Sequence, residues 1–534
     1  MKHISTCLLL AVLALLTACT PRVPDDARAV DRPAHIVPDN GEAVLPPNIA
    51  PLNFRIEEEG SAYVVRLYTD ADPAGIVIGG RTIDIPVKAW HRLLEGARGG
   101  LLHTDIYVRG AEGWQQFATR TNAVAEEGVD PYITYRLIQP SYVDYEDLTL
   151  IERNVTNWDE RVLFSNRMLS DGDDGQCINC HAPRNYNRSG QSQFHVRQKF
   201  GGTVFISGEQ VSKVNLKTDS TLSAGVYASW HPTLPLVAFS VNKTGQIFHT
   251  RSTDKIEVVD YASDLVLYNT ETNQVQHIDA RDDQFETFPC WSPDGGTLYY
   301  ASARYEADAY MAENDFEGLH YNIYSRPYDA ATGLFGRQRL LFDADSIGKS
   351  VAFPRVSPDG RWLLFSMGRS GQFHVWHSDA DLFVLDLQSG TVSALEAANS
   401  PRMESYHAWS SNGRWILFTS RRTDANYTRL YLSYFDEDGQ AHTPLLLPQR
   451  DPRHDERLLR SYNVPEWMVQ PVQASLIQLT EGIRRPALQA EYAGSALAVE
   501  TESEATAAAP PDSTGSNAPL HEAAELEGST PVDY

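Results

Sequence analysis

Basic residues are scarce in this chain. Among 534 residues there are 45 Lys and Arg against 70 Asp and Glu, which gives a formal net charge of −25 at pH 7. A protein that binds nucleic acid presents a basic face to the phosphates, so we expect no nucleic-acid partner. Cysteine is scarce as well, with five residues in all, so the sequence excludes a small fold held together by several disulfides.

Long apolar segments are also lacking beyond the first twenty residues. Leu8 to Leu16 follows a short basic start and is too short to span a bilayer as a mature helix, so we predict a signal peptide at residues 1–18. It ends in Leu16-Thr-Ala-Cys19, which resembles the lipobox of bacterial lipoproteins and implies lipid attachment at Cys19. The alternative is a secretory signal cleaved nearby. Both interpretations predict an exported protein of the cell envelope, facing the periplasm or at the outer membrane, and the lipobox adds a membrane anchor.

Composition divides the rest of the chain into segments. Residues 19–50 are rich in Pro and Asp without periodicity and are expected to be a tether. Residues 51–147 alternate apolar and polar residues between turns, with one helical stretch at 87–97, and predict a small β-sandwich-like domain. Residues 471–534 form a C-terminal extension. From Glu491 onward it contains nine acidic residues and no Lys or Arg, so we expect a disordered tail there.

Residues 148–470 repeat one pattern, in which an apolar strand, a Ser-Pro-Asp-Gly-like turn and a second apolar strand follow one another. The copies are WSPDGGTLYYAS at 291–302, VSPDGRWLLFS at 356–366, WSSNGRWILFT at 409–419 and, more loosely, WHPTLPLVAFS at 230–240. Third and fourth strands follow each copy, which is typical of a β-propeller. The repeats resemble those of TolB-type propellers. We therefore expect an all-β fold with a TolB-like or WD40-like propeller of five or more blades.

A weaker fifth copy is VTNWDERVLFS at Val155–Ser165. If it opens the first blade, the third strand of that blade begins at Gly202 and the fourth at Ser212, and residues 166–201 are a loop inserted between its second and third strands. The corresponding loops of a propeller share one face. We therefore expect that face to contain residues 166–201, 241–263, 302–320, 367–380 and 420–428.

The predicted loop contains Cys177-Ile-Asn-Cys180-His181, a C-x-x-C-H motif. Two thiols at this spacing can add to the vinyl groups of a haem, and the adjacent imidazole can ligate its iron. We predict one covalent haem c, held by Cys177 and Cys180, with His181 as the proximal ligand. The alternatives are a disulfide between the two cysteines and half of a zinc site, although no second C-x-x-C supplies further zinc ligands. Cys290 is expected to be a buried free thiol.

The sixth iron ligand is left open by the sequence. His195 is the first candidate because it lies in the same predicted loop, and Met168 is the second. An occupied sixth position suits electron transfer, whereas an open one permits ligand binding or redox catalysis. Other candidates lie on the predicted shared face: His249, His320, His374, His377, Met311 and Met367.

Two further polar stretches have structural explanations. Asp171–Gly175 is acidic but lacks the twelve-residue loop and terminal Glu of an EF-hand, so a solvated turn is favoured over a calcium site. The stretch from His249 to Asp264, with Glu257 and Asp260, can rim a pocket or bind a cation, but anchoring of a long loop is favoured.

The combined patterns favour an exported, haem c-binding propeller that transfers electrons to a protein partner in the envelope. The first alternative is a non-redox propeller scaffold that binds a protein or ligand, and the second is a haem-dependent oxidoreductase. A hydrolase is disfavoured, because Gly368-Arg-Ser-Gly-Gln372 lacks the final Gly of a G-x-S-x-G elbow and no α/β domain follows the propeller.

Overall fold

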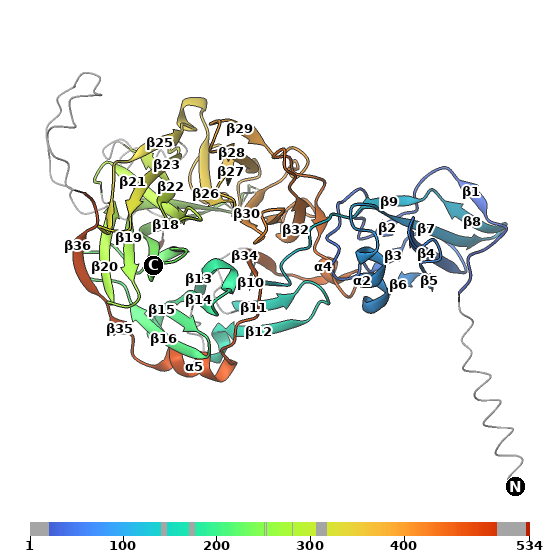
Figure 1. Ribbon diagram of the computed structural model, residues 1–534, viewed down its shortest axis with the longest axis horizontal. Helices are drawn as coiled ribbons and strands as arrows, with labels where there is room; N and C mark the ends of the chain where they lie inside the picture. The colour runs from blue at the N-terminus through green and yellow to red at the C-terminus, as the bar shows by residue number, and fades with distance from the viewer. Residues whose placement is uncertain are drawn as a thin grey trace, which may run out of the picture. The chain divides into compact units, whose positions relative to one another are not determined.

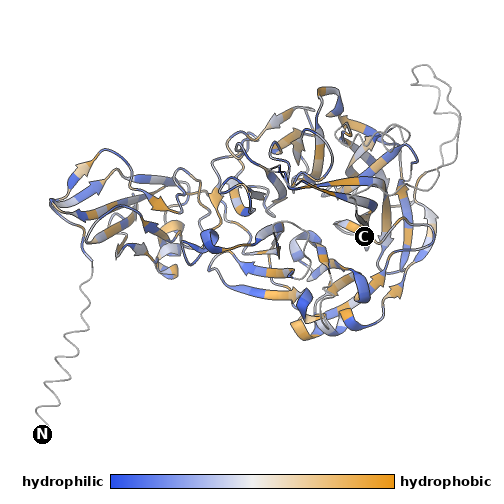
Figure 2. Cartoon of the chain, turned by 180° about the vertical axis from the view of Figure 1, so that it is seen from behind, coloured by the Kyte–Doolittle hydropathy of each residue, from blue (hydrophilic) through white to orange (hydrophobic). Residues whose placement is uncertain are grey.

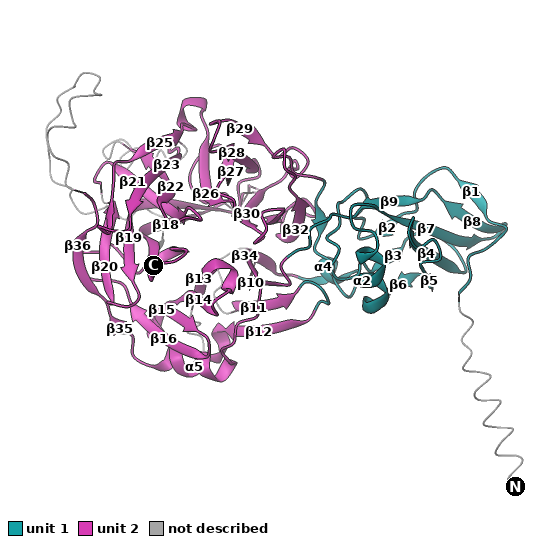
Figure 3. Ribbon diagram, viewed as in Figure 1, with its two compact units in different colours: residues 1–129, 155–158, 443–458 teal, residues 130–154, 159–442, 459–534 magenta. Residues whose placement is uncertain are grey.

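A computed structural model describes residues 21–139, 147–169, 177–249, 251–252, 254–279, 281–305, 318–498 and 530–533. The chain divides into two compact units (Figure 3). Unit 1 consists of residues 1–129, 155–158 and 443–458, and unit 2 of residues 130–154, 159–442 and 459–534. The signal peptide and Cys19 lie outside the described residues, as do Asp171–Gly175 and most of the acidic tail.

Unit 1 has two sheets and one longer helix among its described residues. The larger sheet runs in the order β1-β8-β7-β4-β5, with β9 beside β7, and the smaller in the order β2-β3-β6. Helix α2 (Val87–Glu95) buries Trp90, Leu93 and Leu94 on one face, so the helix predicted there is confirmed. The other bounds are β1 Arg28–Val30, β2 Ile36–Val37, β3 Phe54–Ile56, β4 Tyr63–Thr69, β5 Ile76–Gly79, β6 Thr82–Ile83, β7 Leu101–Gly110, β8 Gly113–Phe117, β9 Arg120–Ala123, β33 Leu445–Leu446 and α4 His454–Arg457.

Unit 2 is a β-propeller (Figure 1). Its described residues form six sheets, and the innermost strands of these sheets, β34, β13, β17, β21, β26 and β30, contact one another in that order around a closed ring. Six blades agree with the prediction of five or more. Apolar and polar residues are mixed along the blade strands (Figure 2), and the strands β21, β30 and β31 are buried along their whole length, as expected where a blade packs against both of its neighbours.

The blades are numbered from the one that joins the two ends of the ring. From the inner to the outer strand, blade 1 consists of β34 (Ser461–Met468), β10 (Tyr132–Ile138), β11 (Thr149–Asn154) and β12 (Glu160–Ser165), and blade 2 of β13 (Ile178–Pro183), β14 (Gln191–Val196), β15 (Gly202–Ser207) and β16 (Gln210–Asn215). Blade 3 consists of β17 (Val226–Trp230), β18 (Leu236–Phe248), β19 (Ile256–Asn269) and β20 (Gln274–Asp279), and blade 4 of β21 (Gln284–Trp291), β22 (Thr297–Arg304) and β23 (Asn322–Asp329), followed by β24 (Leu334–Phe335) and β25 (Arg339–Phe342). Blade 5 consists of β26 (Ser350–Val356), β27 (Trp362–Gly368), β28 (Asp381–Asp386) and β29 (Val392–Ala394), and blade 6 contains β30 (Glu404–Trp409), β31 (Trp415–Ser420) and β32 (Arg429–Tyr434).

Blade 1 corrects the predicted start of the propeller. Residues 160–165 form its outermost strand, and the strand at Tyr132–Ile138, which the alternation placed in the N-terminal domain, pairs with β11 and with the C-terminal strand β34. The inner strand therefore comes from more than 300 residues away. A local repeat cannot reveal such a pairing, because β11 and β12 alone resemble the first half of a blade.

Blade 2 corrects the predicted loop insertion. Ile178–Pro183, which contains Cys180 and His181, is its innermost strand, and Gly202–Ser207 pairs with β14 rather than with β12. Short 3-10 turns, η1 (Asn166–Met168), η2 (Arg184–Asn187) and η3 (Gln198–Phe200), connect these strands. The C-x-x-C-H stretch is thus part of the ring and not a loop attached to it.

The repeated turns have a common hydrogen-bond pattern. In blade 5 the Ser357 hydroxyl donates to Asp359 and accepts from the Trp362 amide (2.9 Å), and Gly360 adopts a positive φ of 75°. Ser292 and Ser410 accept in the same way from the amides five residues on. A short polar side chain and a glycine are needed at these positions, which explains why Ser-Pro-Asp-Gly recurs.

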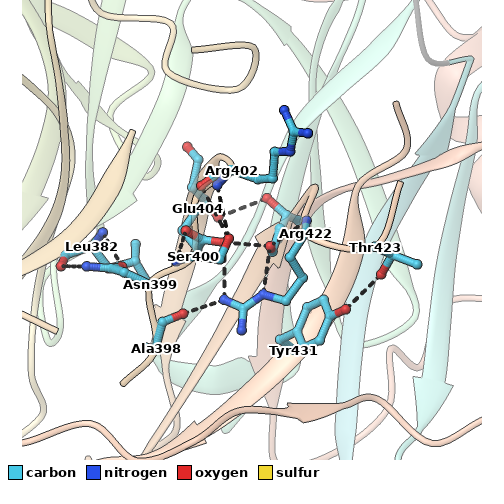
Figure 4. Close-up of polar contacts among 12 residues, drawn as sticks. Leu382, Ala398, Asn399, Ser400, Arg402, Glu404, Arg422, Thr423 and Tyr431 are labelled. Carbon is cyan, nitrogen blue, oxygen red and sulfur yellow. Dashed lines mark hydrogen bonds and ion pairs between the residues drawn. The ribbon is translucent and has the colours of Figure 1, made fainter. Parts of the chain in front are cut away.

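Buried polar contacts hold the start of blade 6. Glu404 is fully buried, and it accepts hydrogen bonds from the Ser400 hydroxyl (2.7 Å) and the Ser420 hydroxyl (2.6 Å). Arg422 donates to the same carboxylate at 3.1 Å (Figure 4). This cluster fixes the loop before β30 to the end of β31.

The C-terminal extension follows the outer edge of the ring. Helix α5 (Leu476–Arg484) begins with a capping box between Ser475 and Gln478. Strand β35 (Leu488–Gln489) then pairs in parallel with β16, and β36 (Glu491–Ser495) with β20. Residues 491–495, where the sequence predicts the start of a disordered tail, are thus in a strand, and β37 (Thr530–Asp533) pairs with β18.

Candidate functional site

Each inner strand contains a bulge at the same place. In blade 2, Cys180 and His181 together face one residue of β14, Phe194, because the register shifts between Asn179 and Ala182. The same shift occurs in the other five blades, and the first residue of each bulge has a positive φ: Cys180, Tyr227, Phe288, Phe353, Tyr406 and Val464, at 43–56°. A left-handed conformation costs a non-glycine residue roughly 1–2 kcal/mol, so each bulge must be held by its surroundings.

The six bulges open onto one cavity, which we call the channel cavity. All six of their first residues line it. Counted out to the open solvent, the space measures about 1080 Å³. Aromatic side chains from four blades form much of its wall: Tyr227, Phe288, Phe353, Phe373 and Tyr406.

Arginine dominates the charge of the channel cavity. Arg136, Arg197 and Arg355 line it, and among the described residues Glu466 is the one acidic side chain in the lining. Arg355 forms an ion pair with Glu466 at 2.8 Å, whereas Arg136 donates to neutral groups, the Ile178 carbonyl and the Asn463 amide oxygen. The cavity therefore has an excess of positive charge and favours an anionic ligand.

Both cysteines of the motif line the channel cavity and are free thiols. Cys177 is buried within an apolar cluster that also contains Ile178 and Phe194. Burial raises the pKa of the Cys180 thiol. Cys290, expected to be a buried free thiol, is one.

His181 is 6% exposed and also lines the cavity. Burial, and then the charge of Arg136, lower its pKa to about 3, so its imidazole is neutral at ordinary pH. Neither ring nitrogen has a hydrogen bond of normal geometry. Two free thiols and a neutral imidazole with an unshared lone pair are the groups that a covalent haem requires, so the residue types fit one.

The position of His181 recurs in blade 6. His407 is likewise the second residue of its bulge, and its Nε2 donates to the carbonyl of Phe353, the first bulge residue of the preceding blade, at 2.7 Å. The equivalent carbonyl for His181 is that of Val464, which lies near enough to raise the pKa of the ring against the stronger effect of burial. A histidine at this position can therefore serve as a contact between blades.

The candidate sixth ligands lie elsewhere. His195 is 2% exposed in β14, and its Nδ1 lies 3.4 Å from the Thr203 hydroxyl. Met168 packs against the apolar cluster that contains Cys177. Neither lines the channel cavity, and nor do His249, His320, His374, His377 or Met367; Met311 is outside the described residues.

The acidic stretch from His249 to Asp264 anchors structure, as favoured above. Asp260 accepts hydrogen bonds from Asn242 (3.1 Å) and from the Tyr321 hydroxyl (2.5 Å), and Glu257 is paired with His377. Among the described residues, no group of three or more His, Cys, Asp or Glu side chains is arranged to hold a metal ion.

The arginines and aromatic residues of the channel cavity were missed by sequence reasoning. A signal for the aromatic residues and for Arg355 is the dipeptide shortly before three of the repeated turns, Phe288-Pro289, Phe353-Pro354 and Tyr406-His407, which Val464-Pro465 of the last inner strand resembles. Alignment of the Cys180-His181 bulge with these dipeptides identifies the C-x-x-C-H motif as part of an inner strand.

No helix in the described residues is long and apolar enough to cross a membrane. No family model matches the chain, and no curated protein does. Among solved structures it is similar to TolB from Acinetobacter baumannii, with 15% identity over 72% of this chain and 85% of that one and a TM-score of 0.41. It is also similar to an oligogalacturonate lyase from Vibrio parahaemolyticus (12% identity, 58% and 92% covered, TM-score 0.31) and to a periplasmic gluconolactonase from Pseudomonas aeruginosa (12%, 59% and 95%, 0.29). These likenesses concern the propeller fold, which the strand order of the chain establishes independently.

Proposed function

We propose that this protein is a binding propeller of the bacterial cell envelope and that the channel cavity is its ligand site. The observation that carries the proposal is the lining: six inner strands bring aromatic walls and three arginines, against one glutamate, to a single space. Such a site suits a ligand with a flat apolar body and carboxylate groups, because the body fills the apolar walls and the arginines bind carboxylates.

Haem c is the ligand that these features favour most specifically. Cys177 and Cys180 would hold it covalently, the neutral imidazole of His181 would face its iron, and Arg136, Arg197 and Arg355 line the space that its carboxylates would enter. When bound, such a group supplies a one-electron couple, which would make the protein an electron carrier with a protein partner in the envelope. The chain's own residues would bind and orient the group and shield it from water.

The second candidate is a scaffold without a redox group, in which the motif is structural. The recurrence of His181 at the position of His407 favours it, because a histidine there contacts the preceding blade in a cavity that needs no haem. In that case Cys177 contributes to the apolar cluster of blade 2.

A haem stain decides between the two candidates. The full chain is produced with its leader in a bacterium that attaches haem c, and the purified protein is run on a denaturing gel. We expect a stained band that disappears in Cys177→Ser with Cys180→Ser and persists in the control Cys290→Ser. A folded wild-type protein without covalent haem would exclude the first candidate and the oxidoreductase alternative together.

The spectrum of the stained protein tests the iron ligands. We expect His181→Gln to retain covalent haem but to change the ferrous spectrum. Carbon monoxide binding by the wild-type protein would indicate an open sixth position and favour the oxidoreductase alternative. If carbon monoxide does not bind the wild-type protein but does bind His195→Ala or Met168→Leu, the residue replaced in that variant is the sixth ligand.

Membrane anchoring at Cys19 is supported by the lipobox resemblance alone. Metabolic labelling with a radioactive fatty acid should mark the wild-type protein, and Cys19→Ala should lose the label. A labelled Cys19→Ala protein would exclude Cys19 as the lipid site.

A further inference from the structure

Two strands of blade 3 are about twice as long as their neighbours. Strand β18 has 13 residues and β19 has 14, and they pair with each other along their whole length. Strand β17 pairs with β18 only as far as Ser240, and strand β20 pairs with β19 only at residues 265–269, so both cover the same half of this hairpin. The other half, residues 243–249 and 254–259, extends beyond the blade, and we call it the strap.

Strand β37 pairs with residues 243–246 of the strap, so the strap is a two-stranded ribbon only beyond them, at residues 247–249 and 254–257. Such a ribbon is marginally stable in water, so this end of the strap needs other contacts. It finds them in blade 5, two blades away, on the loop at residues 369–380 between β27 and β28. Arg369 forms an ion pair with Asp254 at 2.9 Å, and the Ser378 amide donates to the same carboxylate at 3.1 Å. These contacts confirm the prediction that loops 241–263 and 367–380 lie on one face of the propeller.

A second charged contact lies deeper in the junction. His377 is fully buried, and its Nε2 lies 2.5 Å from the Glu257 carboxylate. Burial lowers the pKa of His377, but its hydrogen bond with Glu257 and the charge of that carboxylate outweigh burial and raise the pKa above its usual value. Apolar side chains complete the junction, since Ile256 and Val258 of the strap share one cluster with Phe373 and Trp376 of the loop.

Both sides of this junction form part of the wall of the channel cavity. Gln246 and Val258 of the strap and Phe373 of the loop line it, together with the bulge residues of the inner strands. Separation of the strap from the loop would therefore remove one side of the cavity. The β18–β19 ladder of the strap and its pairing with β37 involve no residue of the loop, so the strap can separate from the loop with its own hydrogen bonds intact.

We propose that the strap is a gate to the channel cavity, held closed by the Glu257–His377 and Asp254–Arg369 contacts, and that ligand enters when this junction opens. The inference rests on the proposed function, in that the gated cavity is the ligand site. It adds a regulatory step: binding is limited by opening of the strap, and a partner that contacts either charged pair can control it.

The test uses the full mature chain with Cys177→Ser and Cys180→Ser, so that no covalent haem can fill the cavity. The probe is 8-anilinonaphthalene-1-sulfonate, which has an aromatic body and one anionic group, and its association is followed by stopped-flow fluorescence. Glu257→Gln keeps the shape of the side chain and removes its charge. We expect association to be faster by roughly tenfold, since that factor corresponds to the loss of one charge-assisted hydrogen bond. The control Glu271→Gln, at an exposed turn of the same blade, should leave the rate unchanged.

A locked strap provides the converse measurement. In the variant Glu257→Cys with His377→Cys, a short bifunctional reagent links the two thiols, and a reductant can cleave the link. The link should slow association of the probe at least tenfold, and its cleavage should restore the rate. If the probe associates at the same rate with the locked and the cleaved protein, while Arg355→Gln still weakens probe binding, the strap is not a gate but the channel cavity is still the ligand site. Binding that Arg355→Gln does not weaken would instead overturn the channel cavity as the anion site. Hydrogen exchange of residues 254–259 and 369–380 should increase in Glu257→Gln, and unchanged exchange counts against the gate.

Discussion

His407 offers a quantitative test of how the blades are held together. Burial, and then the charge of Arg355, lower the pKa of this imidazole to about 3, while its Nε2 donates to the Phe353 carbonyl at 2.7 Å. In the unfolded chain its pKa is about 6.5. A group with a lowered folded-state pKa contributes stability above its unfolded pKa and loses it as pH falls. Stability should thus decrease by about 1.4 kcal/mol per pH unit for this residue between pH 6 and pH 4.

We expect His407→Gln to behave differently at the two ends of this range. At pH 8 the variant should be less stable by about 1–2 kcal/mol, because its amide replaces the imidazole hydrogen bond imperfectly. By pH 4 the variant should match or exceed the wild-type protein, since it has no buried imidazole to protonate and avoids a loss of about 2–3 kcal/mol. Urea unfolding of the two proteins at both pH values gives the difference directly.

Thr419→Val supplies the control for His407→Gln. Thr419 is fully buried and donates to the Ser405 carbonyl at 2.9 Å, but it does not titrate. Its loss of stability should be the same at pH 8 and pH 4. If the difference in unfolding free energy between His407→Gln and the wild-type protein is also the same at pH 8 and pH 4, His407 is not buried in its neutral form.

Three further predictions concern stability, each measured by the urea midpoint of unfolding. Arg422→Met should lower the unfolding free energy by about 3–5 kcal/mol, because it leaves the buried Glu404 carboxylate without its charged partner. The control Arg414→Met removes an ion pair with the largely exposed Glu437 and should lower it by less than about 1 kcal/mol. Equal losses in the two variants would contradict the role of burial. Ser357→Ala removes the hydroxyl that accepts from the Trp362 amide and should cost about 1–2 kcal/mol, whereas no loss would show that the turn does not need it. Gly360→Ala places a side chain at a φ of 75° and should cost about 1–2 kcal/mol, with Gly96→Ala in unit 1, at a φ of −74°, as the tolerated comparison.

The parts of the fold that the sequence predicted are those encoded locally. The Ser-Pro-Asp-Gly turns and the helix at Val87–Glu95 depend on neighbouring residues, so their patterns could be recognised. The pairing of β10 with β34 depends on residues far apart, and no local pattern reports it. For the same reason the copy at Val155–Ser165 was interpreted as the first half of a blade, although β12 is the outer strand of blade 1.

The candidate site was predicted in its residue types but not in its surroundings. Cys177, Cys180 and His181 do line one cavity, as a shared function requires. Cys180-His181 is equivalent to Phe288-Pro289 and Tyr406-His407 in its bulge, but it shares no residue type with Phe288-Pro289 and only the histidine with Tyr406-His407, so the sequence pattern does not place it in an inner strand. Arg136 and Arg355 meet at the cavity from strands of blades 1 and 5, which periodicity alone does not bring together.

The closure of blade 1 has a consequence for biosynthesis. Strand β10 exposes an unpaired edge until residues 461–468 have been made, so more than 300 residues are synthesised while that edge is open. An open strand edge is a site for pairing with other chains, and long-range pairing is slow to form. We therefore expect chains that stop before Ser461 to aggregate even though five blades are already encoded, and a chaperone that covers β10 to be needed from early in synthesis until residues 461–468 have been made.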